Sequence, residues 1–131
     1  MRAAVRDWLP VALWMGAIFW GSSRSTLPSS LGAQSASGDW LRNATHMAEY
    51  AILAALAYRA LRRGAAREPS LSLGALRWKA TLLALALSLG YAFLDEAHQV
   101  FVPGRQFALA DMALDLAGAL LSLGMIGAIQ R

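Results

Sequence analysis

Ionisable and polar side chains gather in one short stretch between two long apolar runs. The stretch reads YAFLDEAHQVFVPGRQFALADMALD from Tyr91 to Asp115. Ionisable groups beside hydrocarbon are costly in free energy, so they mark a candidate functional site. The ionisable and polar residues in question are Asp95, Glu96, His98, Gln99, Arg105, Asp111 and Asp115.

Histidine and carboxylate residues occur one helical turn apart in two segments. His46 and Glu49 stand at i and i+3, as do Asp95 and His98, so each pair shares a helix face. Such pairs supply either ligands for a divalent metal or an acid–base couple, and interhelical hydrogen bonding is the structural alternative. The candidate catalytic residues are His46, Glu49, Asp95 and Glu96, and the candidate metal ligands are His46, Glu49, Asp95 and Asp111.

Carboxylates outnumber basic groups in these segments. Five acids face only two arginines and two histidines. With neutral histidines the set would carry three negative charges, and each buried acid costs about 2.5–3.5 kcal/mol. We therefore expect protonated carboxyls, protonated histidines or a bound cation. The candidate ligand-binding residues are Arg42, His46, Glu49, Tyr50, Asp95, Glu96, His98, Gln99, Arg105, Asp111 and Asp115.

Composition places the chain in a membrane. It has 131 residues, of which 57% are hydrophobic and 15% charged, whereas soluble domains carry about 25% charged residues. We expect one domain over residues 1–131. The net charge is +4, but the basic residues flank apolar runs, which argues against nucleic-acid binding. The chain contains no cysteine, which excludes disulfides and thiolate chemistry.

Four apolar runs predict four membrane-spanning helices, at about residues 8–23, 41–61, 80–102 and 107–129. A spanning helix needs about 17–25 apolar residues, so the first run is short. A cleaved signal peptide is the alternative for it, but the small residues Gly32 and Ala33 lie well beyond the run. We therefore predict an uncleaved helix.

Basic residues set the predicted orientation. The segment 62–79 contains four arginines and a lysine, so it is expected to be a cytoplasmic loop. Both termini are then cytoplasmic, and the loops 24–39 and 103–106 lie outside. The candidate polar residues fall at the outer helix ends. The sequence thus predicts an all-α integral membrane four-helix bundle, N-in and C-in, with a polar pocket on the extracytoplasmic side.

Small residues line the last helix beside its acids. Asp111, Asp115, Gly118 and Ser122 form a stripe that suits close helix contact in a membrane. Contacts within the chain and contacts in a homo-oligomer are both compatible with such residues.

Two segments resemble the VanZ-like family. The string DEAHQVFVPGRQFALADMALDLAGALL, from Asp95 to Leu121, is similar to the family signature of an acidic pair, His-Gln, PGR and spaced aspartates. The string THMAEYAILAAL, from Thr45 to Leu56, resembles the family's H-x-x-x-Y segment, and Ser22–Pro28 resembles its serine-to-proline exit. The chain departs from the pattern at Arg42-Asn43, where a paired lysine is common, and at Gln106-Phe107, where the position after PGR is often small.

The resemblance implies a small multi-pass protein of the bacterial plasma (inner) membrane. The family's founding member is linked to resistance to the glycopeptide teicoplanin. We favour a protein that binds a cell-envelope component, namely a lipid, peptidoglycan precursor or glycopeptide headgroup. A metal-assisted membrane hydrolase or transferase that uses His46, Glu49 and Asp95 is the second interpretation. A proton-coupled transporter is the third.

Overall fold

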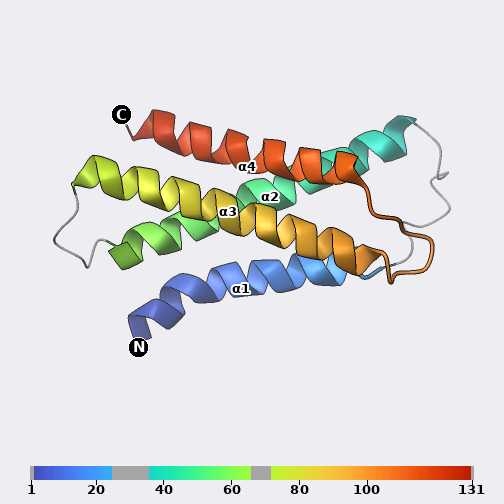
Figure 1. Ribbon diagram of the computed structural model, residues 1–131, viewed down its shortest axis with the longest axis horizontal. Helices are drawn as coiled ribbons and strands as arrows, with labels where there is room; N and C mark the ends of the chain where they lie inside the picture. Colours follow the sequence, from blue (N-terminus) through green and yellow to red (C-terminus); the bar gives the residue numbers. More distant parts are fainter. Residues whose placement is uncertain (1, 25–35, 66–71, 131) are drawn as a thin grey trace.

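The computed structural model describes residues 2–24, 36–65 and 72–130. This part of the chain forms four helices and no strand: α1 (Arg2–Ser22), α2 (Ala36–Ala65), α3 (Leu73–Gln99) and α4 (Leu109–Ile129) (Figure 1). The predicted all-α fold with four helices is therefore confirmed.

Successive helices run in opposite directions along the long axis of the molecule (Figure 1). α1 begins and α4 ends at one end of the molecule, and α2 begins and α3 ends at the other. α2 packs against each of the other three helices, most extensively against α4. All four helices therefore contribute residues to each end of the bundle.

The helices extend beyond four of the eight predicted bounds, namely both ends of α2 and the beginnings of α1 and α3, whereas α4 begins two residues later than predicted. α2 and α3 together include residues 62–65 and 73–79 of the predicted basic loop, and α2 also includes residues 36–39 of the predicted outer loop. Hydropathy marks where apolar surface ends, but helical hydrogen bonds continue through good helix formers such as Arg, Leu and Ala. Residues 25–35 and 66–71 of these loops lie outside the described residues.

Local capping explains where α3 begins and ends. The Ser72 hydroxyl accepts a hydrogen bond from the backbone N–H of Ala75, at 3.3 Å, and so caps the first turn. α3 ends at Gln99, three residues before the predicted end, because Pro103 and Gly104 form the following turn. Gly104 has a φ of +82°, a conformation that favours glycine.

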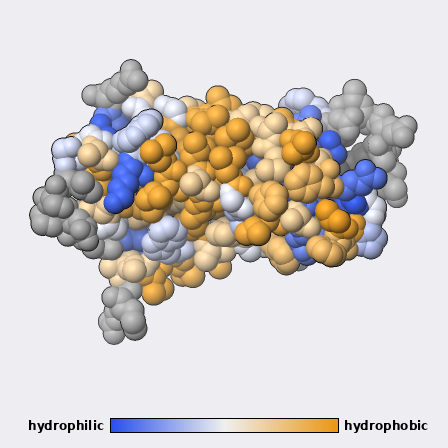
Figure 2. Space-filling view, viewed as in Figure 1, coloured by the Kyte–Doolittle hydropathy of each residue, from blue (hydrophilic) through white to orange (hydrophobic). Residues whose placement is uncertain are grey.

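Two helices, α3 and α4, are long and apolar enough to cross a membrane, as a search of the described residues shows. α1 and α2 do not meet this test. Arg6 and Asp7 fall inside the span of α1, and charged residues such as Arg42 and Arg59 fall inside that of α2. A broad hydrophobic belt nevertheless covers the middle of the visible face, with hydrophilic patches towards both ends (Figure 2).

Small residues bring α2 and α4 close together. Ala54 and Ala57 of α2 share a buried cluster with Ala119 of α4. A Cβ atom at Gly118 would overlap the backbone carbonyl of Met47, so only glycine fits at this crossing. Without hydrophobic attraction between helices in lipid, such close packing is a main source of association.

Replacement of Gly118 by alanine is expected to lower the free energy of unfolding by about 1–3 kcal/mol, because the backbones must separate. Gly127→Ala, on the same helix, is the control, because nothing lies within 4 Å of a Cβ built there. Unfolding in dodecyl maltoside with added SDS, followed by circular dichroism, measures both. Equal stability of the two variants would contradict the proposed contact.

Candidate functional site

The predicted polar residues converge at the end of the bundle where α2 begins and α3 ends. Seven of the side chains there are buried, with at most 8% of their surface exposed. They come from all four helices. The set, called here the acidic cluster, comprises Ser22, His46, Asp95, Glu96, Gln99, Asp111 and Asp115.

His46 lies between the two aspartates of α4. Its Nδ1 atom lies 3.0 Å from Asp115 Oδ1, and its Nε2 atom lies 3.6 Å from Asp111 Oδ2. An ionised carboxylate only accepts hydrogen bonds, so Nδ1–H is the donor to an ionised Asp115. A proton on Nε2 as well would make the ring a cation between two anions. The close approach of Met47 to Gly118 positions His46 for this contact.

Arg42 adds a second, weaker counter-charge. Its Nη2 atom lies 3.6 Å from Asp111 Oδ1, and 45% of its side chain is exposed. Exposed ion pairs contribute about 0–1 kcal/mol, because water screens them. Arg42 therefore compensates Asp111 only in part.

Gln99 links the acids of α3 to one another. Its Nε2 atom donates to Asp95 Oδ2 at 3.1 Å and to Glu96 Oε1 at 3.2 Å. Its Oε1 atom accepts from Arg105 Nη1 at 3.0 Å, and Glu96 Oε2 accepts from the backbone N–H of Ala108 at 2.8 Å. This network fastens the α3–α4 turn to the end of α3.

The turn between α3 and α4 also encloses Glu96 and Arg105. Glu96 is 1% exposed, because the returning turn covers it. Arg105 binds the neutral amide of Gln99 and forms no ion pair within the described residues. The guanidinium of Arg105 is thus left with its full charge at the rim of the cluster.

Ser22 belongs to the acidic cluster although its sequence position suggested an interfacial loop serine. It is the last residue of α1, and its hydroxyl lies 2.7 Å from Asp95 Oδ2. The same hydroxyl lies 2.9 Å from the carbonyl oxygen of Ile18. One hydroxyl proton serves one acceptor at a time, so Asp95 and Ile18 compete for it. The serine-to-proline resemblance had singled out this position in the sequence.

Within the described residues, His98 forms no hydrogen bond or ion pair with Asp95, with which it was expected to share a helix face. Its ring packs on Phe19 with centroids 4.4 Å apart, and Nε2 lies 3.1 Å from Ser23 Oγ. The side chain is half-buried against α1. His98 follows Asp95 by three residues on α3, and at this position its side chain contacts Phe19 and Ser23 of the α1 end.

Glu49 and Tyr50 flank the cluster on α2. Glu49 is half-buried and forms no ion pair with His46 in the described structure; its Oε1 lies 4.0 Å from a Cβ built on Gly21 of α1. The predicted pairing of His46 with Glu49 is therefore replaced by the contact with Asp115. Tyr50 is fully buried, and its hydroxyl has no hydrogen-bond partner among the described residues.

Three carboxylate oxygens of the cluster are buried without a hydrogen-bond partner in the described structure: Asp95 Oδ1, Asp111 Oδ1 and Asp115 Oδ2. A buried acceptor left unpaired costs about 1–3 kcal/mol, and more when it is charged. These atoms could therefore accept hydrogen bonds from a ligand. Among the described residues no group of three or more histidine, cysteine or acidic side chains is arranged to hold a metal ion.

A comparison with protein families identifies the family of this chain. The profile of the VanZ/LLP1 family matches residues 7–130. The chain belongs to the VanZ/LLP1 family. No curated protein and no solved structure matches it. The two segments that carried the resemblance, 45–56 and 95–121, supply six of the seven members of the acidic cluster in this VanZ/LLP1 protein.

Removal of His46 is expected to destabilise the fold strongly. His46→Ala leaves the buried Asp115 without its counter-charge and Asp111 with the exposed Arg42 alone, which should cost about 3–5 kcal/mol of unfolding free energy. A further Asp115→Asn change should recover part of this loss, because it removes one of the uncompensated charges. SDS unfolding of the single and double variants measures the coupling.

His98→Ala is the matched control for His46→Ala, because His98 is half-buried and lies beside the exposed Ser23. It should cost no more than about 1 kcal/mol. Strictly additive effects of His46→Ala and Asp115→Asn would show that the two side chains do not interact.

Proposed function

We propose that this VanZ/LLP1 protein spans the bacterial plasma membrane and binds a cell-envelope component at the acidic cluster. The observation that carries the proposal is the set of buried carboxylate oxygens without partners. The cluster, with Glu49, holds five acids against Arg42, Arg105 and the histidine ring. A ligand that brings ammonium, amide or hydroxyl donors would complete these contacts. Lipid, peptidoglycan-precursor and glycopeptide headgroups all carry such donors.

The proposed orientation is N-in and C-in, with the cluster facing outward. Basic residues flank the opposite end of the bundle, at Arg59, Arg62, Arg63 and Lys79. Positive charge beside spanning segments is retained in the cytoplasm. α1 begins and α4 ends at that same end, which would place both there (Figure 1).

Exposed tryptophans on α1, α2 and α3 support a spanning position for these helices. Trp8 and Trp78 lie near the basic end, and Trp20 and Trp40 near the acidic end, and each is at least 38% exposed. Tryptophan concentrates at both membrane–water interfaces, where its ring is half in hydrocarbon. Two aromatic belts are what a membrane-spanning bundle requires.

A second candidate, an enzyme, rests on His46. The hydrogen bond from His46 Nδ1 to Asp115 would fix the tautomer and orientation of the ring, as in acid–base sites. Elemental analysis of the purified protein for bound metal would separate the metal-assisted version from one that needs no metal. A transporter has less support, because the buried middle of the bundle is mostly alanine and leucine, and Ser88 donates to its own helix at Ala84.

The orientation can be tested with single cysteines, since the chain has none. Phe101→Cys, in the α3–α4 turn, should react with a membrane-impermeant maleimide added to intact spheroplasts. Trp78→Cys should react only after permeabilisation. Both side chains are well exposed, at 83% and 66%. The cysteine-free parent is the blank, and the reverse labelling pattern would refute the orientation.

Asp111→Asn tests ligand binding at the acidic cluster. Native mass spectrometry with phosphatidylethanolamine, a lipid-linked peptidoglycan precursor and teicoplanin should detect a complex with the unmodified protein. The variant should bind at least about tenfold more weakly, because a hydrogen bond to a charged group contributes about 1.5–3 kcal/mol.

Thr45→Val is the control for this experiment. Thr45 is exposed, and its hydroxyl donates to the carbonyl of Leu41 in its own helix. Binding by this variant should match that of the parent. Failure of all three probes to bind, or equal binding by Asp111→Asn, would rule out the proposal.

A further inference from the structure

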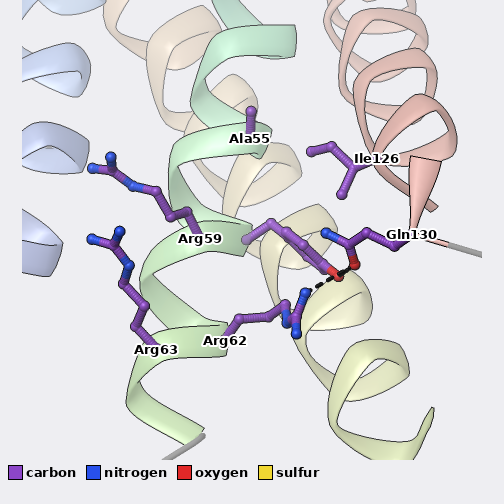
Figure 3. Close-up of a pocket in the computed structure, with 7 residues that line it drawn as sticks. Ala55, Arg59, Arg62, Arg63, Ile126 and Gln130 are labelled. Atoms are coloured by element: carbon purple, nitrogen blue, oxygen red, sulfur yellow. Dashed lines mark hydrogen bonds between the residues drawn. The ribbon is translucent and has the colours of Figure 1, made fainter. Parts of the chain in front are cut away.

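A cavity lies at the end of the bundle opposite the acidic cluster. It encloses about 390 Å³ and is lined by residues of α2 and α4 (Figure 3). Arg59, Arg62 and Arg63 supply its charge, and Tyr58 and Gln130 its uncharged polar groups. The sequence had suggested only a basic loop here, because arginines beside a span are usually solvated.

Positive charge exceeds negative charge around this cavity. Arg63 pairs with the buried Asp7 of α1, with Nη1 3.3 Å from Oδ1. Arg62 donates to the neutral amide of Gln130, and Arg59 has no carboxylate partner among the described residues. Among the described residues, three guanidinium groups thus lie near one carboxylate, an excess of two positive charges.

Two hydrogen-bond donors converge on one atom at the cavity. Tyr58 Oη and Arg62 Nη1 both donate to Gln130 Oε1, at 2.8 and 2.9 Å. Figure 3 shows Arg62 reaching across to Gln130, while Arg59 and Arg63 project from α2 one turn apart. An anionic oxygen in place of the amide oxygen would accept the same two hydrogen bonds, and from Arg62 a charge-assisted one.

Apolar surface adjoins the charged groups. Ile126 and Ala55 line the cavity, and Met125 and Ile129 of α4 are 65% and 82% exposed beside it. Arg62 is sixteen residues from His46 along α2, or about 24 Å at 1.5 Å per residue. This distance approaches the thickness of a bilayer's hydrocarbon core, about 30 Å. The cavity therefore lies at headgroup depth if the acidic cluster lies at the other surface.

We propose that this cavity binds the phosphodiester headgroup of an anionic phospholipid from the cytoplasmic leaflet. Guanidinium groups match phosphate in charge and geometry, and basic pockets between spanning helices suit anionic headgroups. The apolar wall favours a lipid over free phosphate, because acyl chains can lie along α4. A headgroup with two phosphates, as in cardiolipin, matches the excess of two positive charges and binds more tightly than one with a single phosphate.

Native mass spectrometry of the full chain, released from detergent with each lipid added, tests this site. Cardiolipin should bind most tightly, phosphatidylglycerol less tightly and phosphatidylcholine least. Arg59→Gln and Arg62→Gln should each weaken cardiolipin binding about fivefold. Arg59→Lys, which keeps the charge, should weaken it less than Arg59→Gln. Circular dichroism checks that each variant is folded.

Lys79→Gln is the matched control, since it removes an exposed positive charge at the same end but outside the cavity. It should leave cardiolipin binding unchanged, and equal weakening by Lys79→Gln would show diffuse attraction rather than a site. Inorganic phosphate at millimolar concentration should not displace the lipid; if it does, the site is one for free phosphate. Binding of all three lipids with equal affinity would also overturn the proposal.

Discussion

Carboxylates buried beside an apolar bundle need partners, and this requirement organises one end of the molecule. Each helix meets part of it: Ser22 from α1, His46 from α2, Gln99 from α3, and the backbone of Ala108 before α4. The bonds from Ser22, His46 and Ala108 each join different elements, whereas Gln99 bonds within α3 and links that helix end to Arg105 of the following turn. Within the described residues, three carboxylate oxygens remain without a hydrogen-bond partner, so the structural demand and the candidate binding chemistry arise from one set of atoms.

Helix packing and site geometry are linked on α2 and α4. Gly118 lies one turn after Asp115, and Met47 directly follows His46. The close backbone approach at Gly118 is therefore what allows Nδ1 of His46 to reach Asp115. A larger residue at Gly118 would move α2 and α4 apart and so lengthen the contact between His46 and Asp115, without itself touching a polar group. In this protein a packing residue and a candidate binding pair cannot be altered independently.

The sequence predicted the helices and the end of the bundle at which the polar residues meet, but not which side chains pair with one another. Apolar runs and helical spacing correctly brought residues from α2, α3 and α4 together, because periodicity determines the face of a helix. Partners across helices depend on rotation and crossing position, which periodicity does not contain. In the structure His98 therefore packs on Phe19, and His46 contacts Asp115 rather than Glu49. The arginine cavity was missed for the same reason, because it forms only where α2 meets α4.

α2 contributes to both the acidic cluster and the arginine cavity, and the rise per residue of an α-helix is fixed. α2 fixes the separation between His46 and Arg62 at about 24 Å. In a membrane, that separation sets a preferred hydrocarbon thickness for the protein. A thicker bilayer must thin around the bundle or draw one charged end into hydrocarbon, and tilting would make the mismatch worse. If α2 spans the membrane as proposed, the distance between its two polar ends fixes the bilayer thickness that the protein matches best.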